Sequence, residues 1–116
     1  SVKNFLYRRI GVDIGKNVVI SPHAQIDPFF PEKITIRDNA LLGWNTKLFV
    51  HEFYTDHLKI GEIEIGEGAL VGADSLVFPG TRIGKGAIVA AKSFVNRDVE
   101  DMEEVGGVPV EHIKNL

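Results

Sequence analysis

The chain contains no cysteine, which excludes disulfide bonds and metal sites built from thiolates. It has no run of about 18 apolar residues, so the sequence predicts no membrane-spanning helix. No secretory signal opens the chain, and Ser1 in place of an initiator Met suggests a trimmed or incomplete N-terminus. The net charge of −3 argues against a nucleic-acid partner. With 44% hydrophobic and 25% charged residues, the 116 residues are typical of one soluble domain.

Aliphatic residues recur at every sixth position through the second half of the chain. Each six-residue step begins with Ile or Val and holds Ala, Ser or Thr at its fifth place. A fixed short period is typical of a β-solenoid, whereas a helix would need spacings of three and four and an ordinary strand a spacing of two. The first places are Ile65, Val71, Val77, Ile83, Val89 and Val95.

The period also predicts which side chains face the interior. The first residue of each step should point inward and stack on its equivalent in the next coil, at about the 4.8 Å spacing of paired strands. The small fifth residue should fill the narrow space at a corner. We expect Gly at second and fourth places to supply the turns between faces, because glycine reaches positive φ easily.

The same pattern occurs upstream, with two interruptions. Residues 27–33 lengthen one corner, and residues 49–64 form a longer insertion of the kind that often carries a site. With three faces per coil, we expect about four coils, at 14–31, 34–48, 63–82 and 83–96. The prediction is a single all-β domain, a parallel β-helix over 14–96 with an inserted loop 49–64, an N-terminal cap 1–13 and a C-terminal cap 97–116.

Both ends of the β-helix should be covered, because open ends expose unpaired backbone groups. Residues 2–10 mix apolar and basic side chains and predict a short amphipathic helix over the first coil. Residues 98–104 are acidic and predict a loop, followed by a terminal piece 110–116. Several outward places carry apolar side chains, which predict contacts with a neighbouring chain: Leu70, Leu76, Phe78, Ile88 and Phe94. Trp44 occupies another outward place, where it could pack at a subunit boundary or shape the acceptor site.

Further motifs make the pattern specific. They are the hexads themselves, Ile34-Thr35-Ile36, His51-Glu52, the run 78–84, Asn96-Arg97-Asp98-Val99 and Gly107-Val108-Pro109. With these motifs the chain resembles the left-handed β-helix hexapeptide acyltransferases, near the galactoside and maltose O-acetyltransferase branch. The resemblance implies left-handed winding, a homotrimer with active sites between subunits, and a cytoplasmic location. It also implies acetyl-CoA as co-substrate, with no bound cofactor and no metal.

In such a family the reaction is acyl transfer from a CoA thioester to a hydroxyl, which needs a general base. The resemblance assigns that role to His51, which lies in the inserted loop just beyond Leu48. Glu52 would hold the imidazole in one tautomer, although a backbone carbonyl could do so equally well. The expected acceptor is a hydroxyl of a sugar or a similar small molecule.

The resemblance also assigns binding residues. Acceptor contacts are expected from Tyr54, His57, Ser21 and Asp27, where Asp27 could instead organise the Pro28–Pro31 corner. Glu111 departs from the family pattern, where Arg is common and would suit CoA phosphates. The expected acyl-CoA contacts are Gly72, Ala73, Ala90, Ala91, Asn96, Arg97 and Lys114.

Two other functions stay open at this point. A non-catalytic hexapeptide module, acting as a scaffold, would keep the fold without the chemistry. A metalloenzyme resembling the γ-carbonic anhydrases would need three imidazoles on one metal, and His23, His51 and His57 could supply them.

Overall fold

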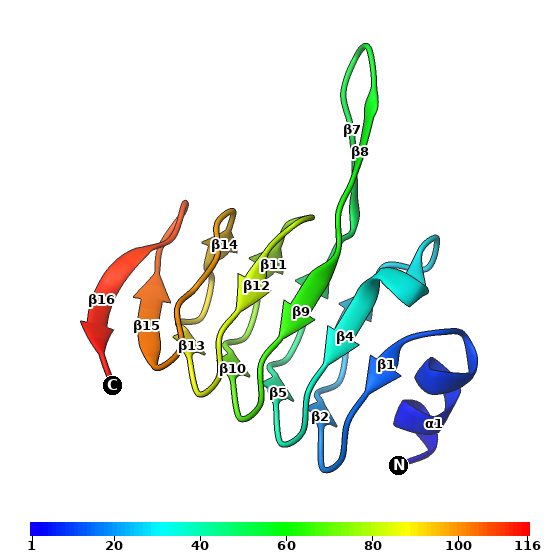
Figure 1. Ribbon diagram of the computed structural model, residues 1–116, viewed down its shortest axis with the longest axis horizontal. Coiled ribbons are helices and arrows are strands. Elements are labelled where there is room, and N and C mark those ends of the chain that lie inside the picture. Colours follow the sequence, from blue (N-terminus) through cyan, green and yellow to red (C-terminus); the bar gives the residue numbers. More distant parts are fainter.

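The computed structural model describes all 116 residues and is a three-sided parallel β-helix, with the N-terminal helix at one end and the last strands at the other (Figure 1). Short strands from successive coils stack into three sheets, here called A, B and C in the order in which the chain visits them. All strand pairings between coils are parallel. The arrangement is consistent with the left-handed β-helix that the family resemblance implies.

The strands of each sheet are given in their spatial order. Sheet A contains β1 (Asp13–Ile14), β4 (Ile34–Ile36), β9 (Ile63–Ile65) and β12 (Arg82–Ile83). Sheet B contains β2 (Val19–Ile20), β5 (Leu41–Leu42), β10 (Leu70–Val71), β13 (Ile88–Val89), β15 (Glu103–Gly106) and β16 (Glu111–Asn115). Sheet C contains β3 (Gln25–Ile26), β6 (Lys47–Leu48), β11 (Leu76–Val77) and β14 (Phe94–Val95).

The interior confirms the predicted six-residue pattern. First-place residues such as Val71, Val77 and Val89 are fully buried, and equivalent residues of adjacent coils pair in register. The small fifth-place residues are also buried, including Ala69, Ala87 and the hydroxyl-bearing Thr46, Ser75, Thr81 and Ser93. Those hydroxyls donate to backbone carbonyls, as Ser93 Oγ does to Ala90 O at 2.6 Å, so no buried polar side chain is left unpaired.

Glycines at the second and fourth places serve different purposes, which corrects the prediction that both supply positive φ. Fourth places do take positive φ, at Gly68 and equally at Asn39 and Asp74. Second-place glycines have ordinary φ but lie against the next coil. A Cβ at Gly66 would come within 2.6 Å of the Gly84 carbonyl carbon, so the close stacking of coils requires glycine there.

Helix α1 (Val2–Arg9) confirms the predicted N-terminal cap, but it docks by polar side chains. Asn4 Nδ2 donates to Val18 O at 2.8 Å, and Lys3 Nζ donates to Ile20 O at 3.1 Å. Arg8 donates to Ile14 O and Gly15 O in the same way. The apolar Phe5 and Leu6 are exposed, because the open edge of the first coil presents carbonyls that need donors. No helix in the structure is long and apolar enough to cross a membrane.

The β-helix continues past residue 96, so the predicted loop at 98–104 is only partly correct. Val99 is buried and bridges to Ile83, and β15 pairs in parallel with β13. Strand β16 then returns antiparallel to β15 and covers the end of sheet B. The sequence predicts a loop here because charged residues fill most of the positions between the inward-facing Val99 and Val105. These charged residues make the last coil resemble a solvent-exposed segment.

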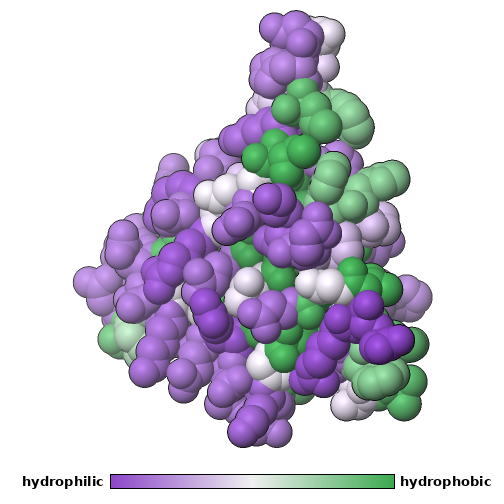
Figure 2. All heavy atoms as spheres, turned by 45° about the vertical axis from the view of Figure 1, so that its right-hand side comes forward, coloured by the Kyte–Doolittle hydropathy of each residue, from purple (hydrophilic) through white to green (hydrophobic).

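The two interruptions both lie on the edge where sheet C passes to sheet A. The first contains the short helix η1 (Pro31–Lys33). The second contains a β-hairpin of β7 (His51–Phe53) and β8 (Leu58–Ile60), paired antiparallel, which projects from the body of the molecule (Figure 1). In Figure 2 the hairpin has a hydrophilic tip above apolar side chains.

Candidate active site

The side chain of His51 is paired with Asp27 at the base of the hairpin. Both residues lie on the C–A edge, since Asp27 follows β3 and His51 opens β7. The in-register pairing of Ile26 with Leu48 brings the two together across 24 positions of sequence. His51 Nδ1 is hydrogen-bonded to Asp27 Oδ2. With Nδ1–H donating to the carboxylate, Nε2 is left as the proton acceptor, so the pair forms a base with a fixed tautomer.

Asp27 is held as a charged carboxylate. Its side chain is fully buried, and it accepts hydrogen bonds from Phe29 N–H at 2.9 Å and from Val50 N–H at 3.0 Å. Burial raises the pKa of Asp27, but these two hydrogen bonds and the His51 ring outweigh it and leave the pKa below its ordinary value. These contacts organise the corner, which is the second of the two roles that the sequence leaves open, and they also orient His51, which the sequence did not predict. No surface of the Asp27 side chain is exposed in the single chain.

Three phenylalanine rings surround the His51 imidazole. Phe29, Phe30 and Phe53 lie edge-to-face with it, at centroid distances of 5.4, 5.9 and 5.3 Å. Phe30 packs against the core, whereas Phe29 and Phe53 are 71% and 77% exposed. The imidazole itself is only 14% exposed. Its approach is therefore narrow and lined with aromatic rings.

Glu52 does not take the orienting role predicted for it. Adjacent residues of a strand point to opposite faces, so Glu52 faces away from the His51 ring. Its carboxylate instead accepts from Tyr54 Oη at 3.2 Å and lies 3.9 Å from Lys59 Nζ. The Glu52 charge also raises the pKa of Tyr54.

Tyr54 and His57, predicted as acceptor contacts, lie together at the hairpin tip. Their rings stack at 4.5 Å, and Tyr54 N–H donates to His57 O. His57 Nδ1 is 2.6 Å from Asp56 Oδ1, so its polar group is paired within the tip. Both residues belong to the same hairpin as His51, and their side chains contact each other and their neighbours in the tip rather than the Asp27–His51 pair.

The small residues predicted to bind acyl-CoA form a continuous line on the B–C edge. Gly72 and Ala90 follow equivalent strands of sheet B, and Gly72 N–H donates to Val89 O at 2.8 Å. Ala73 and Ala91 are the next residues in each turn, and Lys92 N–H donates to Ala73 O. Ser21 occupies the equivalent place of the first coil, so the structure groups it with this line and separates it from His51.

The predicted nucleotide contacts are dispersed and partly engaged. Asn96 is exposed on the C–A edge. Arg97, beside it, donates to Asp98 O and to Glu103 Oε2. Lys114 lies on β16, with Nζ 3.9 Å from Glu104 Oε1. One chain therefore does not bring Asn96 and Arg97 to the small residues on the B–C edge.

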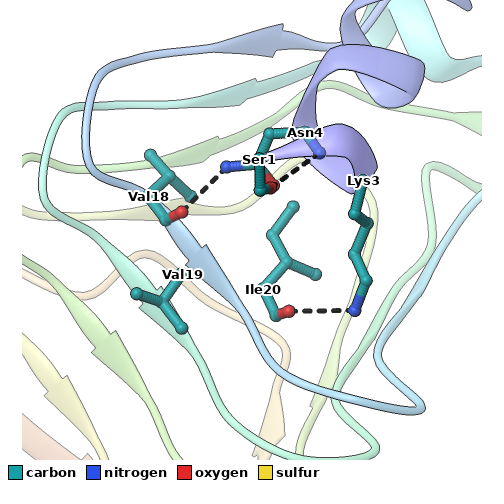
Figure 3. A pocket seen from close by; sticks show the side chains of 6 residues that line it. All are labelled: Ser1, Lys3, Asn4, Val18, Val19 and Ile20. Carbon is teal, nitrogen blue, oxygen red and sulfur yellow. Dashed lines mark hydrogen bonds between the residues drawn. The ribbon is translucent and has the colours of Figure 1, made fainter.

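A hollow of about 310 Å³ lies elsewhere, between α1 and β2 (Figure 3). Its polar side chains Lys3 and Asn4 already donate to backbone carbonyls of the first coil. The hollow shares no residue with the Asp27–His51 pair. It is a consequence of the way the helix covers the open edge.

Sequence reasoning missed the pairing of Asp27 with His51 and the three phenylalanine rings. Aligning Ile26 with Leu48 as equivalent first places would have set Asp27 beside the start of the insertion, so a signal for the pairing exists. The rings had no comparable signal, because Phe29 and Phe53 lie in the two interruptions, where the six-residue period gives no register.

Comparisons with known proteins agree with the hexapeptide-repeat fold. A family model described as the hexapeptide repeat of succinyl-transferase matches residues 62–97. YvoF of Bacillus subtilis is 37% identical over 94% of this chain and 64% of its own length. SAR0816 of Staphylococcus aureus is 34% identical over 94% of this chain and 68% of its own length. Both carry the name "putative acetyltransferase". The chain thus spans about two thirds of the length of these relatives.

Solved structures share the fold. A maltose O-acetyltransferase from Clostridium difficile superposes with a TM-score of 0.80 at 18% identity, covering 98% of this chain and 74% of the other. The hexapeptide-repeat acetyltransferase VCA0836 of Vibrio cholerae, solved with acetyl coenzyme A, gives 0.81 at 22% identity, covering 99% and 76%. At these identities the likeness establishes the β-helix architecture.

Proposed function

The chain belongs to the hexapeptide-repeat acetyltransferases, and we propose that it transfers an acetyl group from acetyl-CoA to a hydroxyl of a sugar or similar small acceptor. The observation that carries this proposal is the buried Asp27 carboxylate on Nδ1 of His51. The carboxylate also accepts two backbone N–H groups of the corner, but its bond to the ring holds the imidazole at a surface edge with Nε2 as the proton acceptor. As a base with a fixed tautomer, the pair suits proton removal from a hydroxyl.

The reaction follows from the pair's chemistry. Nε2 of His51 accepts the hydroxyl proton as the acceptor oxygen attacks the thioester carbonyl, and Asp27 stabilises the imidazolium that forms. The tetrahedral intermediate then collapses, the carbon–sulfur bond breaks, and the thiolate of CoA takes the proton from the imidazolium. An acetyl ester and free CoA leave, and His51 is again neutral.

The donor site is proposed on a second copy of the chain. The small residues suited to an extended pantetheine arm, including Gly72 and Ala90, lie on the B–C edge, whereas His51 lies on the C–A edge. A cyclic assembly that sets the C–A edge of one chain beside the B–C edge of the next would complete the site. A homotrimer, as the family resemblance implies, does this with sheet C facing the axis. The reaction is proposed to occur in the cytoplasm.

The two alternatives are less well supported. A scaffold role leaves the buried Asp27–His51 pair unexplained. A metalloenzyme would need three ligating side chains within reach of one ion, but no such group gathers in this chain. His23 instead lies edge-on to Trp44, and His57 is paired with Asp56.

The test is calorimetric titration with acetyl-CoA, followed by an assay of thiol release with candidate acceptors. Saturable binding near one site per chain, with thiol release that depends on a hydroxyl acceptor, is the expected result. A correctly assembled protein that binds no acetyl-CoA would contradict the proposal and favour the scaffold role.

A further inference from the structure

Phe29 and Phe53 are the least protected apolar side chains near the candidate base. Both lie beside His51, and both leave most of their surface exposed, at 71% and 77%. Phe29 lies in the first interruption of the β-helix and Phe53 in the second, and both interruptions leave the body of the molecule at the C–A edge. The two rings contact the same imidazole from separate segments. Their exposed faces do not pack in the hydrophobic core and are open to a ligand.

The third ring has a different environment. Phe30 packs against the core and backs the imidazole, so it supports the arrangement. Since the imidazole is 14% exposed, a hydroxyl that reaches Nε2 passes beside Phe29 and Phe53. Whatever carbon skeleton carries that hydroxyl therefore contacts aromatic rings.

The charged groups of the hairpin are already paired with neighbouring side chains. Glu52 is engaged with Tyr54 and Lys59, and Asp56 with His57. Asp27, the charge nearest to the base, is buried and occupied by three hydrogen bonds. An acceptor that carries an ammonium or a carboxylate would need an opposite charge here, because desolvating an unpaired ion is costly. The surroundings of His51 thus favour a neutral acceptor.

We propose that Phe29 and Phe53 determine acceptor specificity by packing against the C–H face of an uncharged pyranoside, which deepens the proposed function and rests on it. The face of an aromatic ring is electronegative, and the axial C–H groups of a pyranose are weakly positive, so the two surfaces attract while the hydroxyls stay at the rim. His51 then takes the proton from one rim hydroxyl.

The first measurement is saturation-transfer NMR on the whole protein with methyl β-D-glucopyranoside in the presence of CoA. The expected result is transfer to the ring C–H protons, lost in the double variant Phe29→Leu/Phe53→Leu and kept in Phe53→Trp. Leucine keeps the bulk and removes the aromatic face, so this pair separates stacking from simple hydrophobic contact. Phe5→Leu, on the exposed face of α1, is the matched control. No transfer in the unaltered protein, or equal transfer in the double variant, would overturn the proposal.

Kinetics separates this proposal from the proposed function. In the leucine variants the KM for the pyranoside should rise about tenfold with kcat little changed, and acetyl-CoA binding should be unaltered. His51→Ala should lose turnover yet keep the NMR contact, so a failure of the chemistry and a failure of the aromatic contact give different patterns. If L-serine is acetylated at least as efficiently as the pyranoside, or if the leucine variants change the mass of the assembly by light scattering, the rings serve another purpose and the specificity proposal is wrong.

Discussion

The Asp27–His51 pair shows how single residues acquire function from their surroundings. His51 is one of four histidines, and the other three contact Trp44, Asp56 and Glu103 at more exposed sites. Only His51 combines a buried carboxylate on one ring nitrogen with a shielded position for the other. The chemistry proposed for the protein depends on that combination.

Replacing His51 with Ala should abolish the proton transfer and leave the donor site intact. We expect kcat to fall by about 10²-fold or more, because a positioned general base contributes that much. Acetyl-CoA affinity, measured by calorimetry, should not change. A variant that turns over at the normal rate would show that His51 is not the base.

The Asp27→Asn substitution tests orientation without changing side-chain volume. Asparagine has one acceptor oxygen in place of two, so it loses either the bond from Phe29 N–H or the bonds from Val50 N–H and His51 Nδ1, and it carries no charge to stabilise the imidazolium. We expect kcat/KM to fall at least about tenfold with KM little changed. Glu52→Gln is the control, and it should have almost no effect because Glu52 faces Tyr54 and Lys59.

At the scale of elements, the turns and the terminal hairpin carry most of the constraints on sequence. Regular corners, such as the one at Gly66 and Gly68, combine a residue at positive φ with a residue pressed against the next coil. The last coil is held by a carboxylate, Glu103, which accepts from Glu100 N–H, His112 Nδ1 and Arg97 Nη2. Each feature makes a separate prediction about stability.

Two glycines of one corner should respond differently to substitution. Gly66→Ala places a methyl group 2.6 Å from the Gly84 backbone, so we expect the free energy of unfolding to fall by about 1–3 kcal/mol. Gly68→Asn should change it much less, because Gly68 has open space around it and Asn39 adopts the same positive φ in the equivalent place. Chemical denaturation of both variants checks the difference. Equal losses of unfolding free energy in the two variants would mean that backbone φ, rather than the close spacing of coils, determines which residues are tolerated at both positions.

Glu103 should make stability depend on pH in the acid range. The hydrogen bond from Glu100 N–H, followed by those from His112 and Arg97, lowers its pKa from 4.5 to about 2 despite burial. Because the folded pKa is below the unfolded one, the stabilisation is complete above about pH 4.5 and is lost as the pH falls towards 2.

The Glu103→Gln variant tests this dependence. At pH 7 its free energy of unfolding should be about 1–3 kcal/mol lower than that of the unaltered chain. The gap should close as the pH approaches 2. Glu104→Gln is the control, since Glu104 is partly exposed and meets only Lys114. A constant gap at all pH values would show that the Glu103 charge does not stabilise the hairpin.

At the scale of the whole molecule, the two halves of the proposed site lie on different edges of the prism. The C–A edge carries His51, and the B–C edge carries the line of small residues. Both edges border sheet C, whose outward row includes Leu76 and Phe94 in register, with Phe78 and Phe94 at a centroid distance of 4.2 Å. The same row also contains Gln25 and Lys47, so its apolar half is the part formed by Leu76 and Phe94. An apolar patch between two complementary edges fits a closed ring of copies with sheet C inside.

Leu76→Lys should therefore disrupt assembly and activity together. The new ammonium group would be buried in the ring beside Lys47, its in-register neighbour of like charge, so we expect monomers by light scattering and loss of acetyl transfer. The circular dichroism spectrum should keep its β-sheet signal, because Leu76 points outward. Arg82→Gln, outward on sheet A, should leave both assembly and activity unchanged. An assembled and active Leu76→Lys protein would exclude sheet C from the interface.

The sequence by itself determined the β-helix and its interior. First places such as Ile65 and Val89 are buried as their spacing predicts, because each coil repeats the same local geometry and six residues always return the chain to an equivalent place. The family motifs likewise pointed to His51 and to the inserted segment that carries it. These features follow from local order along the chain.

Only the tertiary structure decided what surrounds His51 and how the last coil is held. Phe29 and Phe53 meet the imidazole because two irregular segments leave the same edge, and neither segment has a period from which its direction could be inferred. Arg97 is engaged by Glu103 for a similar reason, since the charged run between them obscures the continued coil. A short repeat specifies the stacking of coils, whereas contacts between its interruptions depend on the register of whole coils in space.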